Sequence, residues 1–375
     1  MFFINQIIFL EIVFWIFIAA IAIQLFHHWF IFSRFAFYKA KEEQNEPVPV
    51  SVVISAKNEY NNLKKNLPLI LEQDYPDFEV VIVNDASDDE TIFYLEDLEK
   101  KYNHLKVVNI AQDLNFFSGK KFPLALGIKS SKNNYLLLTD ADCTPASPSW
   151  IKIIASSFND KKKVVLGYGK YKSEEGFLNK IIRFETVSTA IQYFSFALMG
   201  MPYMGVGRNL AYKKSLFYKS KGFISHYNVS SGDDDLFINK VADNVNTQIE
   251  INPESFTISA AKQTFNEWWI QKKRHLSTGK YYKTKHKFLL GSYSLSLFIV
   301  FLLFIMLLCI NYQLWIIVSA LVFRELSQLI IFKKSFKKLN EKKILLISPI
   351  IEVILILLYP LLFISNLFIR QNKWK

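Results

Sequence analysis

The sequence predicts an α/β domain with a mostly parallel sheet, preceded and followed in the chain by about four membrane-spanning helices. Strand-like runs alternate with helical patterns between residues 48 and 138, which favours parallel strands joined by helices on both faces. Four other runs are apolar over about 20 residues, the length that crosses a bilayer. We therefore expect an N-terminal transmembrane helix and flank at 1–39, a soluble domain at 40–287 and a C-terminal transmembrane region at 288–375.

The apolar runs define the expected membrane segments. They cover residues 7–33, 288–310, 314–332 and 344–369. No basic residue precedes the first run, which is also too long for a cleaved signal peptide. The chain is therefore expected to be a multi-pass integral protein of the inner (cytoplasmic) membrane.

Basic residues beside these runs predict their orientation. The chain has 45 Lys+Arg against 33 Asp+Glu, and much of this excess lies at 34–41, 272–287 and 333–343. In a four-span arrangement these three flanks share one side, which the positive-inside rule makes cytoplasmic together with the soluble domain. Because membrane flanks account for the charge, no nucleic-acid partner is expected.

Two features of the C-terminal region do not fit a simple bundle of spans. The basic tail at 370–375 would lie outside after a fourth crossing. Either the last apolar run, which contains Pro349 and Pro360, crosses incompletely, or the tail is tolerated. The Arg324-Glu325 pair inside the third run is expensive in lipid unless it faces the helix bundle or a partner.

The elements of the soluble domain alternate regularly. Strands are predicted at residues 48–55, 78–83, 105–110 and 135–138, where β-branched or apolar residues run together. Between them, apolar residues recur at helical spacing at 63–71, 92–98 and 122–129. Ser87 or Asp88 is expected to cap the second helix. This β-α-β-α-β-α-β order is that of a parallel sheet with helices on both faces.

Polar and acidic side chains follow successive strands. They are Asn58 and Glu59, Asp85 and Ser87, Gly119 and Lys120, and Asp140 and Asp142. Because open α/β sheets bind ligands at the carboxyl ends of their strands, these residues are expected to line a crevice. Asp140 and Asp142 face the same side of an extended segment, so both can approach one hard divalent cation such as Mg²⁺. The alternative is that Asp-x-Asp only begins a turn.

Five sequence segments that carry most of these polar residues follow one another along the chain. They are V-S-V-V-I-S-A-K-N-E (50–59), V-V-I-V-N-D-A-S-D-D (80–89), G-K-K-F-P-L-A-L (119–126), T-D-A-D (139–142) and S-G-D-D-D-L (231–236). In this order and spacing they resemble the family 2 glycosyltransferases with the GT-A fold, in their membrane-embedded branch, over residues 48–280. The resemblance implies a GT-A-type sheet and an inverting hexosyltransferase that uses Mg²⁺ or Mn²⁺.

The resemblance also implies roles for single residues. The nucleotide-sugar donor is expected to contact Ala56, Asn58, Glu59, Asp85, Ser87, Lys120 and Asp140, with Asp85 where relatives that use UDP-sugars hold uracil. Asp142, together with Asp140, is expected to hold the metal on the leaving diphosphate. Asp234 is favoured over Asp233 as the base that deprotonates the acceptor, although such acids also cap helices. Asn209 is expected on the acceptor side.

A sixth segment matches only partly. Q-K-K-R-H, from Gln271 to His275, resembles the Q-x-x-R-W of polysaccharide-extending relatives. Gln271 and Arg274 are therefore expected to contact the donor, with Arg274 on the leaving diphosphate. His275 stands where those relatives carry the Trp that helps to bind the acceptor sugar, which argues against processive synthesis.

The resulting hypothesis is a glycosyltransferase that moves a sugar from a nucleotide sugar, expected to be a UDP-sugar, to a lipid-linked or cell-envelope acceptor. A processive synthase with a polysaccharide acceptor is one alternative, and a non-catalytic membrane assembly protein that keeps the fold is another. The stretch at 187–201 is expected to be either an interfacial helix that presents a lipid acceptor or a core helix. Trp268 and Trp269 are expected to anchor a helix in the membrane interface.

Overall fold

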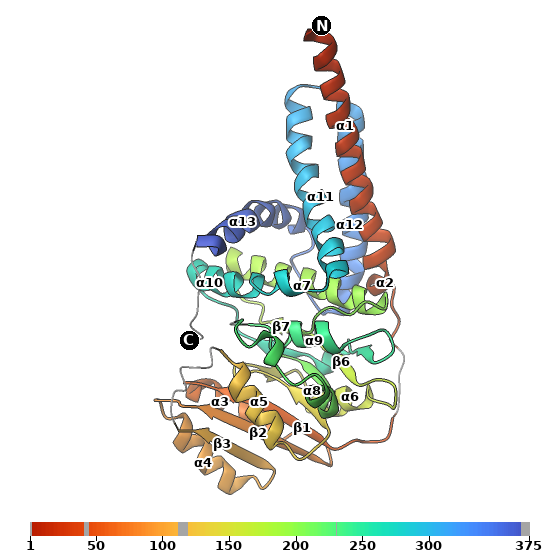
Figure 1. The fold of residues 1–375 in the computed structure, drawn as a ribbon. Coiled ribbons are helices and arrows are strands. Elements are labelled where there is room, and N and C mark those ends of the chain that lie inside the picture. Colours follow the sequence, from red (N-terminus) through yellow and green to blue (C-terminus); the bar gives the residue numbers. More distant parts are fainter. Residues whose placement is uncertain (1, 41–44, 112–118, 230, 369–375) are drawn as a thin grey trace. The chain divides into compact units, whose positions relative to one another are not determined.

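A computed structural model describes residues 2–40, 45–111, 119–229 and 231–368 (Figure 1). The chain divides into two compact units. Met1–Tyr38 and Lys283–Ile364 form the first, here called the helical unit, and Lys39–Tyr282 with Ser365–Lys375 form the second, the sheet unit. The tail at 370–375 lies outside the described residues.

The helical unit contains the four expected apolar segments as helices. The first runs through α1 (Phe2–Phe26), the π-helical turn His27–Phe32 and α2 (Ser33–Ala36), and it is followed by α11 (Thr284–Cys309), α12 (Leu314–Lys338) and α13 (Ser348–Phe368). By length and composition all four are capable of crossing a membrane. Phe17 of α1, Val300 of α11 and Ile317 of α12 are fully buried together, so these three helices share one apolar core.

The sheet unit is built on a seven-stranded sheet of order β3-β2-β1-β4-β8-β6-β9. In chain order the strands are β1 (Val50–Ala56), β2 (Phe78–Asp85), β3 (Leu105–Ile110), β4 (Tyr135–Leu138), β6 (Val164–Leu166), β8 (Leu210–Lys213) and β9 (Thr247–Ile249). The first four are parallel, as the sequence predicts, whereas β8 runs antiparallel to both β4 and β6. A smaller sheet joins β5 (Thr144–Pro145), β10 (Thr257–Ser259) and β7 (Gly169–Tyr171).

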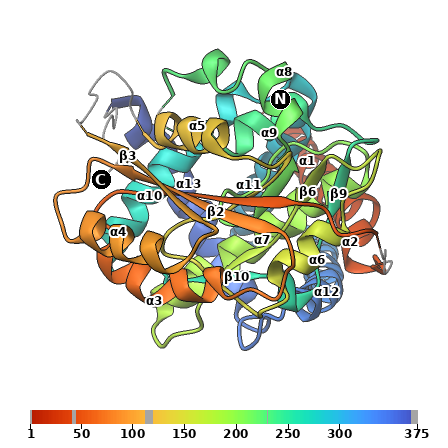
Figure 2. The ribbon, with the colours of Figure 1, turned by 90° about the horizontal axis from the view of Figure 1, so that it is seen from below.

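Helices cover both faces of the large sheet (Figure 2). One face carries α3 (Tyr60–Leu71), α4 (Thr91–Lys101) and α6 (Trp150–Ser156), and the other carries α5 (Lys121–Ser130) and α9 (Asp235–Val241). Every residue of β1 is buried, which explains why this strand is mostly apolar rather than alternating between apolar and polar residues. On the α5 face, Gly127 has no side chain because a Cβ there would lie 2.7 Å from Val53 Cγ1 and 3.0 Å from Val83 Cγ2.

The structure corrects the expected cap of α4 and the expected role of Trp268, and it decides between the two alternatives for residues 187–201. Neither Ser87 nor Asp88 caps α4; instead Asp89 Oδ1 accepts the N–H of Thr91 at 3.0 Å. Trp268 is not an interfacial anchor, because it is fully buried and its Nε1 donates to the Glu185 carboxylate at 3.2 Å. The stretch at 187–201 belongs mainly to α7 (Phe177–Leu198), which buries residues on most of its surface and is therefore a core helix.

Candidate active site

The carboxyl ends of β1 and β2 are hydrogen-bonded to each other. The Ser87 hydroxyl accepts the backbone N–H of Asn58 at 2.9 Å, and Asn58 Oδ1 accepts the N–H of Asp88 at 2.9 Å. Asn58 and Ala86 both have positive φ angles, 55° and 48°, so each strand turns sharply where it meets the rim of the sheet. The first two polar pairs of the rim are thus joined, as the sequence predicts from the parallel topology.

Other residues expected near the donor occupy the same edge. Ala56 is the last residue of β1 and is fully buried, so only its backbone can meet a ligand. Glu59 follows at the start of α3, where its carboxylate accepts from Asn62 Nδ2 at 2.5 Å. Asp85 ends β2 and is half-buried. The Glu59 and Asp85 side chains and the backbone of Ala56 thus lie along the carboxyl ends of the strands.

The Asp-x-Asp segment follows β4 and brings its two carboxylates together. One ligand atom from each of Asp140, Asp142 and Cys143 lies within 4.8 Å of the others. The Lys120 ammonium makes an ion pair with the Asp140 carboxylate. Although desolvation opposes ionisation, this ion pair lowers the pKa of Asp140, so the carboxylate is charged at neutral pH.

This donor set fits a hard divalent cation. Carboxylate oxygens are the protein ligands that Mg²⁺ and Mn²⁺ prefer, and a substrate phosphate ordinarily completes their coordination. Burial raises the pKa of the Cys143 thiol well above its ordinary value, so the sulfur stays protonated and is a poor ligand for such an ion. Asp140 and Asp142 are therefore the two residues of this group that fit the metal.

Three successive acids at the start of α9 have distinct contacts. Asp234 is the N-cap, and its two carboxylate oxygens accept the N–H groups of Asp235 and Gly207, each at 2.7 Å. Desolvation, followed by the charges of Asp233 and Asp235, raises the pKa of Asp234 to about 8. Asp233 is half-buried, and no hydrogen bond to its carboxylate is found among the described residues. Asp234 is thus fixed by the backbone, whereas Asp233 is not.

Lys120 connects the two acidic groups. Its ammonium pairs with Asp140, and Asp140, Asp233 and Asp234 all stabilise the charged form against desolvation, so its pKa is raised. The neighbouring Lys121 donates to the backbone carbonyls of Val229 and Ser231, just before the three acids. The Gly-Lys-Lys segment therefore lies between the Asp-x-Asp segment and α9.

Arg208 is a charged residue of this region that the sequence analysis did not single out. Its guanidinium lies 4.2 Å from the centre of the Tyr171 ring and donates to Ser259 Oγ at 2.9 Å. The charge of Arg208 is also among those that lower the pKa of Asp140. The signal in the sequence was its place in Gly207-Arg208-Asn209, a segment that resembles an acceptor-side loop of the relatives but does not predict these distant partners.

The partly matching segment lies on α10 (Phe265–Leu276), which is held against α7. The buried Glu185 carboxylate of α7 accepts from Trp268 and pairs with Lys272 at 2.7 Å. Gln271 Nε2 donates to Tyr171 Oη at 3.4 Å, and the charge of Arg274 contributes to the lowered pKa of Asp140. Gln271 and Arg274 therefore belong to the same region as the Asp-x-Asp segment.

Asp235 joins α9 to the chain that follows α10. Its Oδ2 accepts the hydroxyl groups of Thr278 at 2.5 Å and Tyr282 at 2.7 Å, and burial raises the pKa of its carboxyl group. The sequence pattern gave no reason to separate Asp235 from its two neighbours. Its partners lie more than forty positions away in the chain.

Asn209 does not fit its expected position on the acceptor side. The residue is fully buried, and its Oδ1 accepts the indole N–H of Trp150 at 3.1 Å. Its Nδ2 donates to the carbonyls of Tyr168 at 3.1 Å and Ser255 at 2.8 Å. All the hydrogen bonds of this amide are therefore made to other buried residues, and they join α6 to the loop between β6 and β7 and to the turn before β10.

Comparisons with known proteins agree with this fold. The model of the family described as "Glycosyl transferase family 2" matches residues 51–227. A probable glycosyltransferase of Bacillus subtilis, YdaM, is 26% identical over 268 residues, which are 68% of this chain and 61% of that protein. The poly-beta-1,6-N-acetyl-D-glucosamine synthase of Staphylococcus epidermidis is 28% identical over 158 residues, 42% of this chain and 37% of that protein.

A solved structure extends the likeness over most of the chain. The mannosyltransferase PcManGT from Pyrobaculum calidifontis, in complex with GDP-Man and Mn²⁺, superposes with a TM-score of 0.60 at 16% identity, covering 93% of this chain and 98% of that one. The mixed sheet and its flanking helices therefore have the GT-A-type fold. Residues 51–227 match the family 2 glycosyltransferase model, so this segment of the chain is a family 2 glycosyltransferase domain. The predicted fold class and enzyme class are both confirmed.

Proposed function

We propose that the protein is an inverting, metal-dependent glycosyltransferase that moves a sugar from a UDP-sugar to a lipid-linked or cell-envelope acceptor at the cytoplasmic face of a membrane. The observation that carries this proposal is the position of Lys120. It pairs with Asp140, a candidate metal ligand, and it also lies within electrostatic reach of Asp233 and Asp234, the candidate bases. Groups suited to a diphosphate and to an acceptor hydroxyl are thus close together.

The donor would lie along the carboxyl edge of the sheet. Asp85 and the joined turns at Asn58 and Ser87 supply hydrogen-bonding groups for a base and ribose. Asp140 and Asp142 would hold Mg²⁺ or Mn²⁺, which when bound neutralises charge on the departing diphosphate. Lys120 would remain beside that diphosphate, and Arg274 is a second cation of the same region.

We assign the removal of the acceptor proton to Asp233, with Asp234 as its positioning residue. A general base must be ionised at the working pH and must have a lone pair directed at the acceptor. Asp234 meets neither condition well, since its pKa is raised to about 8 and both of its oxygens already accept backbone N–H groups. This reverses the preference for Asp234 that the motif alone suggested.

The transfer itself would be a single displacement. The acceptor oxygen loses its proton to the Asp233 carboxylate and forms a bond to the anomeric carbon, while the bond from that carbon to the diphosphate oxygen breaks. The nucleoside diphosphate leaves with the bonding electrons, and the anomeric configuration inverts. The chain's own contribution is to hold donor and acceptor in line and to stabilise the developing charge.

The acceptor is proposed to be membrane-bound because the chain carries four apolar helices that can cross a bilayer. The name of the Staphylococcus epidermidis relative supports a second candidate, a processive synthase of a polysaccharide. Against it stands His275, which is solvent-exposed at the position of the expected Trp.

The test is nucleotide release by the detergent-purified full chain, offered UDP-, GDP- and dTDP-sugars with Mg²⁺ or Mn²⁺, with and without a membrane lipid extract. We expect metal-dependent release from one UDP-sugar, stimulated by the lipid and accompanied by one sugar per acceptor. Polymer in the product would favour the processive synthase. Binding of a donor without release of its nucleotide under any condition would favour the alternative of a non-catalytic membrane assembly protein.

A further inference from the structure

We propose that Arg208 is a further donor-binding residue, whose guanidinium binds a phosphate oxygen of the nucleotide sugar beside the Asp140 and Asp142 carboxylates. This inference rests on the donor site proposed above and deepens it. It adds a cation whose charge no protein group neutralises by direct contact. Three properties of Arg208 support it: where its backbone is held, how its side chain is oriented, and which of its donor atoms have no partner.

The loop before β8 holds the backbone of Arg208 between the Asp-x-Asp segment and the acids of α9. The Arg208 carbonyl accepts the hydroxyl of Thr139, the residue directly before Asp140, at 2.9 Å. The N–H of the preceding residue, Gly207, donates to Asp234 Oδ2 at 2.7 Å. Two successive residues of one loop are thus bonded to the two acidic groups of the candidate site. A donor that reaches from one group toward the other would lie beside Arg208.

Neutral groups of the smaller sheet orient the Arg208 side chain. Its guanidinium lies 4.2 Å from the centre of the Tyr171 ring, and its Nη1 donates to Ser259 Oγ at 2.9 Å. Tyr171 of β7 and Ser259 of β10 are paired in that sheet, and both are buried. Gly169 leaves room for the side chain, because a Cβ there would lie 2.9 Å from Arg208 Cβ and 3.3 Å from its Nε. A side chain that is already ordered loses little conformational entropy when it binds a ligand.

None of these contacts neutralises the guanidinium. Arg208 is half-buried, and it makes no ion pair with any residue that the structure describes. Although desolvation opposes the charged form, groups that include Tyr171, Asp142 and Asp140 keep the pKa of Arg208 above its ordinary value, so the two carboxylates act on it at longer range than an ion pair. Because a partly buried charge without a paired partner is costly, this guanidinium suits an anionic ligand.

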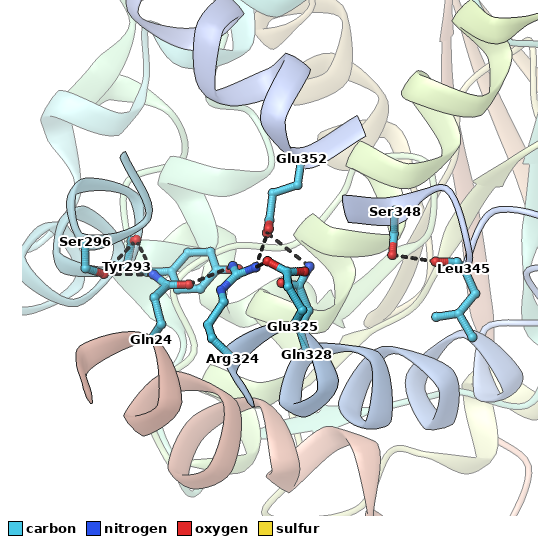
Figure 3. Close-up of polar contacts among 9 residues, drawn as sticks. All are labelled: Gln24, Tyr293, Ser296, Arg324, Glu325, Gln328, Leu345, Ser348 and Glu352. Carbon is cyan, nitrogen blue, oxygen red and sulfur yellow. Dashed lines mark hydrogen bonds and ion pairs between the residues drawn. The ribbon is translucent and has the colours of Figure 1, made fainter. Parts of the chain in front are cut away.

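Arg324 of the helical unit is a contrasting case (Figure 3). This guanidinium is fully buried, and its Nη1 pairs with Glu325 at 2.6 Å and with Glu352 at 2.7 Å. Its Nη2 donates to Gln24 Oε1 at 3.0 Å. Residues of α1, α12 and α13 therefore surround Arg324, which faces the interior of the helical unit rather than lipid. Protein carboxylates neutralise its charge, whereas the charge of Arg208 is left for a ligand.

A phosphate group fits the free edge of Arg208. With Nη1 bonded to Ser259, the Nε and Nη2 atoms remain, and neither donates to a described residue. These two N–H groups lie on one edge of the guanidinium, which is the arrangement that binds two oxygens of one phosphate. Lys120 is less suited to this role, because its ammonium is already paired with Asp140. Arg208 therefore supplies a charge that Lys120 shares with the protein.

Calorimetric titration of the purified full chain with UDP and with inorganic pyrophosphate tests the proposal. Wild type, Arg208→Gln and Arg208→Lys are each measured with Mg²⁺ and after chelation of the ion. We expect Arg208→Gln to weaken the binding of both ligands about 10- to 100-fold, the effect of losing hydrogen bonds between charged groups. The loss should persist after chelation, because the guanidinium contacts the phosphate directly. Arg208→Lys should recover part of the affinity, since it keeps the charge but not the two-pronged edge.

Two further variants separate binding from folding. Lys106→Gln is the matched control, because it removes an exposed positive charge at the amino end of β3, and it should leave both affinities unchanged. Ser259→Ala removes the acceptor of Nη1 and keeps the charge of Arg208, so it should weaken both ligands only about 2- to 10-fold. A thermal melt of each variant in the same detergent identifies any loss of folded protein. If Arg208→Gln does not fold, the comparison of Ser259→Ala with wild type decides the proposal.

The outcomes distinguish this proposal from the proposed function. Equal affinities of wild type and a folded Arg208→Gln would overturn the role of Arg208 and leave the glycosyltransferase proposal intact. A loss confined to UDP, with pyrophosphate binding unchanged, would also overturn it, since the effect would then concern the nucleoside. Binding of pyrophosphate that depends on Arg208, without any binding of UDP, would support the role of Arg208 and contradict UDP as the nucleotide. Wild type that binds neither ligand would contradict both proposals.

Discussion

The contacts of the three acids at the start of α9 make a sharp prediction about which of them takes the proton. Asp233→Asn removes a carboxylate with no hydrogen bond among the described residues, so it should leave the fold unchanged. If this carboxylate is the general base, kcat should fall by roughly 10²- to 10⁴-fold while donor binding stays near normal.

Asp234→Asn should behave differently. Asn is as good an N-cap as Asp, so the bond to Asp235 can be kept, but an amide offers one oxygen where two backbone N–H groups now find acceptors. One of these N–H groups loses its acceptor, which costs about 1–3 kcal/mol. For a unit of this size that corresponds to a fall in Tm of roughly 2–12 °C. The raised pKa leaves the Asp234 carboxyl largely protonated at neutral pH, so little charge repulsion is relieved in return.

The assay is single-turnover transfer at saturating donor, together with a thermal melt of each variant in the same detergent. Asp97→Asn, an exposed acid on α4, is the matched control and should change neither quantity. The reasoning is refuted if Asp233→Asn keeps most of the wild-type kcat while Asp234→Asn abolishes transfer at an unchanged Tm. That result would make Asp234 the base, as the motif first suggested.

Three further predictions follow from the sheet unit. Gly127→Ala should destabilise the protein by about 1–3 kcal/mol in a thermal melt, because the new Cβ would lie 2.7 Å from the core residue Val53. Gly291→Ala on α11 is the control and should leave the stability unchanged, because no heavy atom lies within 4 Å of its new Cβ. Asp234 has a pKa of about 8 in the folded protein and about 3.9 in the unfolded chain, so folding takes up a proton at pH values between these two and the Tm should fall as the pH rises from about 5 to 8. Asp234→Asn should make this dependence of Tm on pH less steep, and an equal slope in both proteins would contradict the raised pKa. Asp235→Asn should lower kcat/KM about tenfold, because it weakens the hydrogen bonds that hold the segment after α10. Thr278→Val removes the hydrogen bond from the Thr278 hydroxyl to Asp235 and should reproduce part of this loss, whereas a change in Tm alone would indicate a purely structural role.

The sequence predicts the part of the fold that depends on local pattern. Three of the four parallel strands, β1, β2 and β4, are mainly runs of buried residues, and the order of the strands along the chain already implies the shared rim on which Asn58, Asp85 and Asp140 lie. The other half of the sheet, which begins at the antiparallel strand β8, is harder to predict from the sequence, because β6 and β9 are only three residues long and pair with strands far away in the chain.

The candidate site shows the same limit. Motif order was enough to bring Lys120 and Asp140 together, but it did not reveal that Arg208 stacks on Tyr171. Asn209 was assigned to the acceptor side from its neighbours in the chain, yet its amide serves Trp150 and two buried carbonyls. Such contacts join residues far apart in sequence, so no periodicity or spacing signals them.

The measurement that tests the central claim most directly is calorimetric binding of UDP to the purified full chain, with Mn²⁺ present and with Mn²⁺ removed by chelation, for wild type and for Asp142→Ala. The account predicts that wild type binds UDP with Mn²⁺ and binds it far more weakly without the ion, and that Asp142→Ala behaves with Mn²⁺ as wild type does without it. Equal binding by both proteins, regardless of the ion, would contradict a metal–diphosphate site at the carboxyl edge of the sheet.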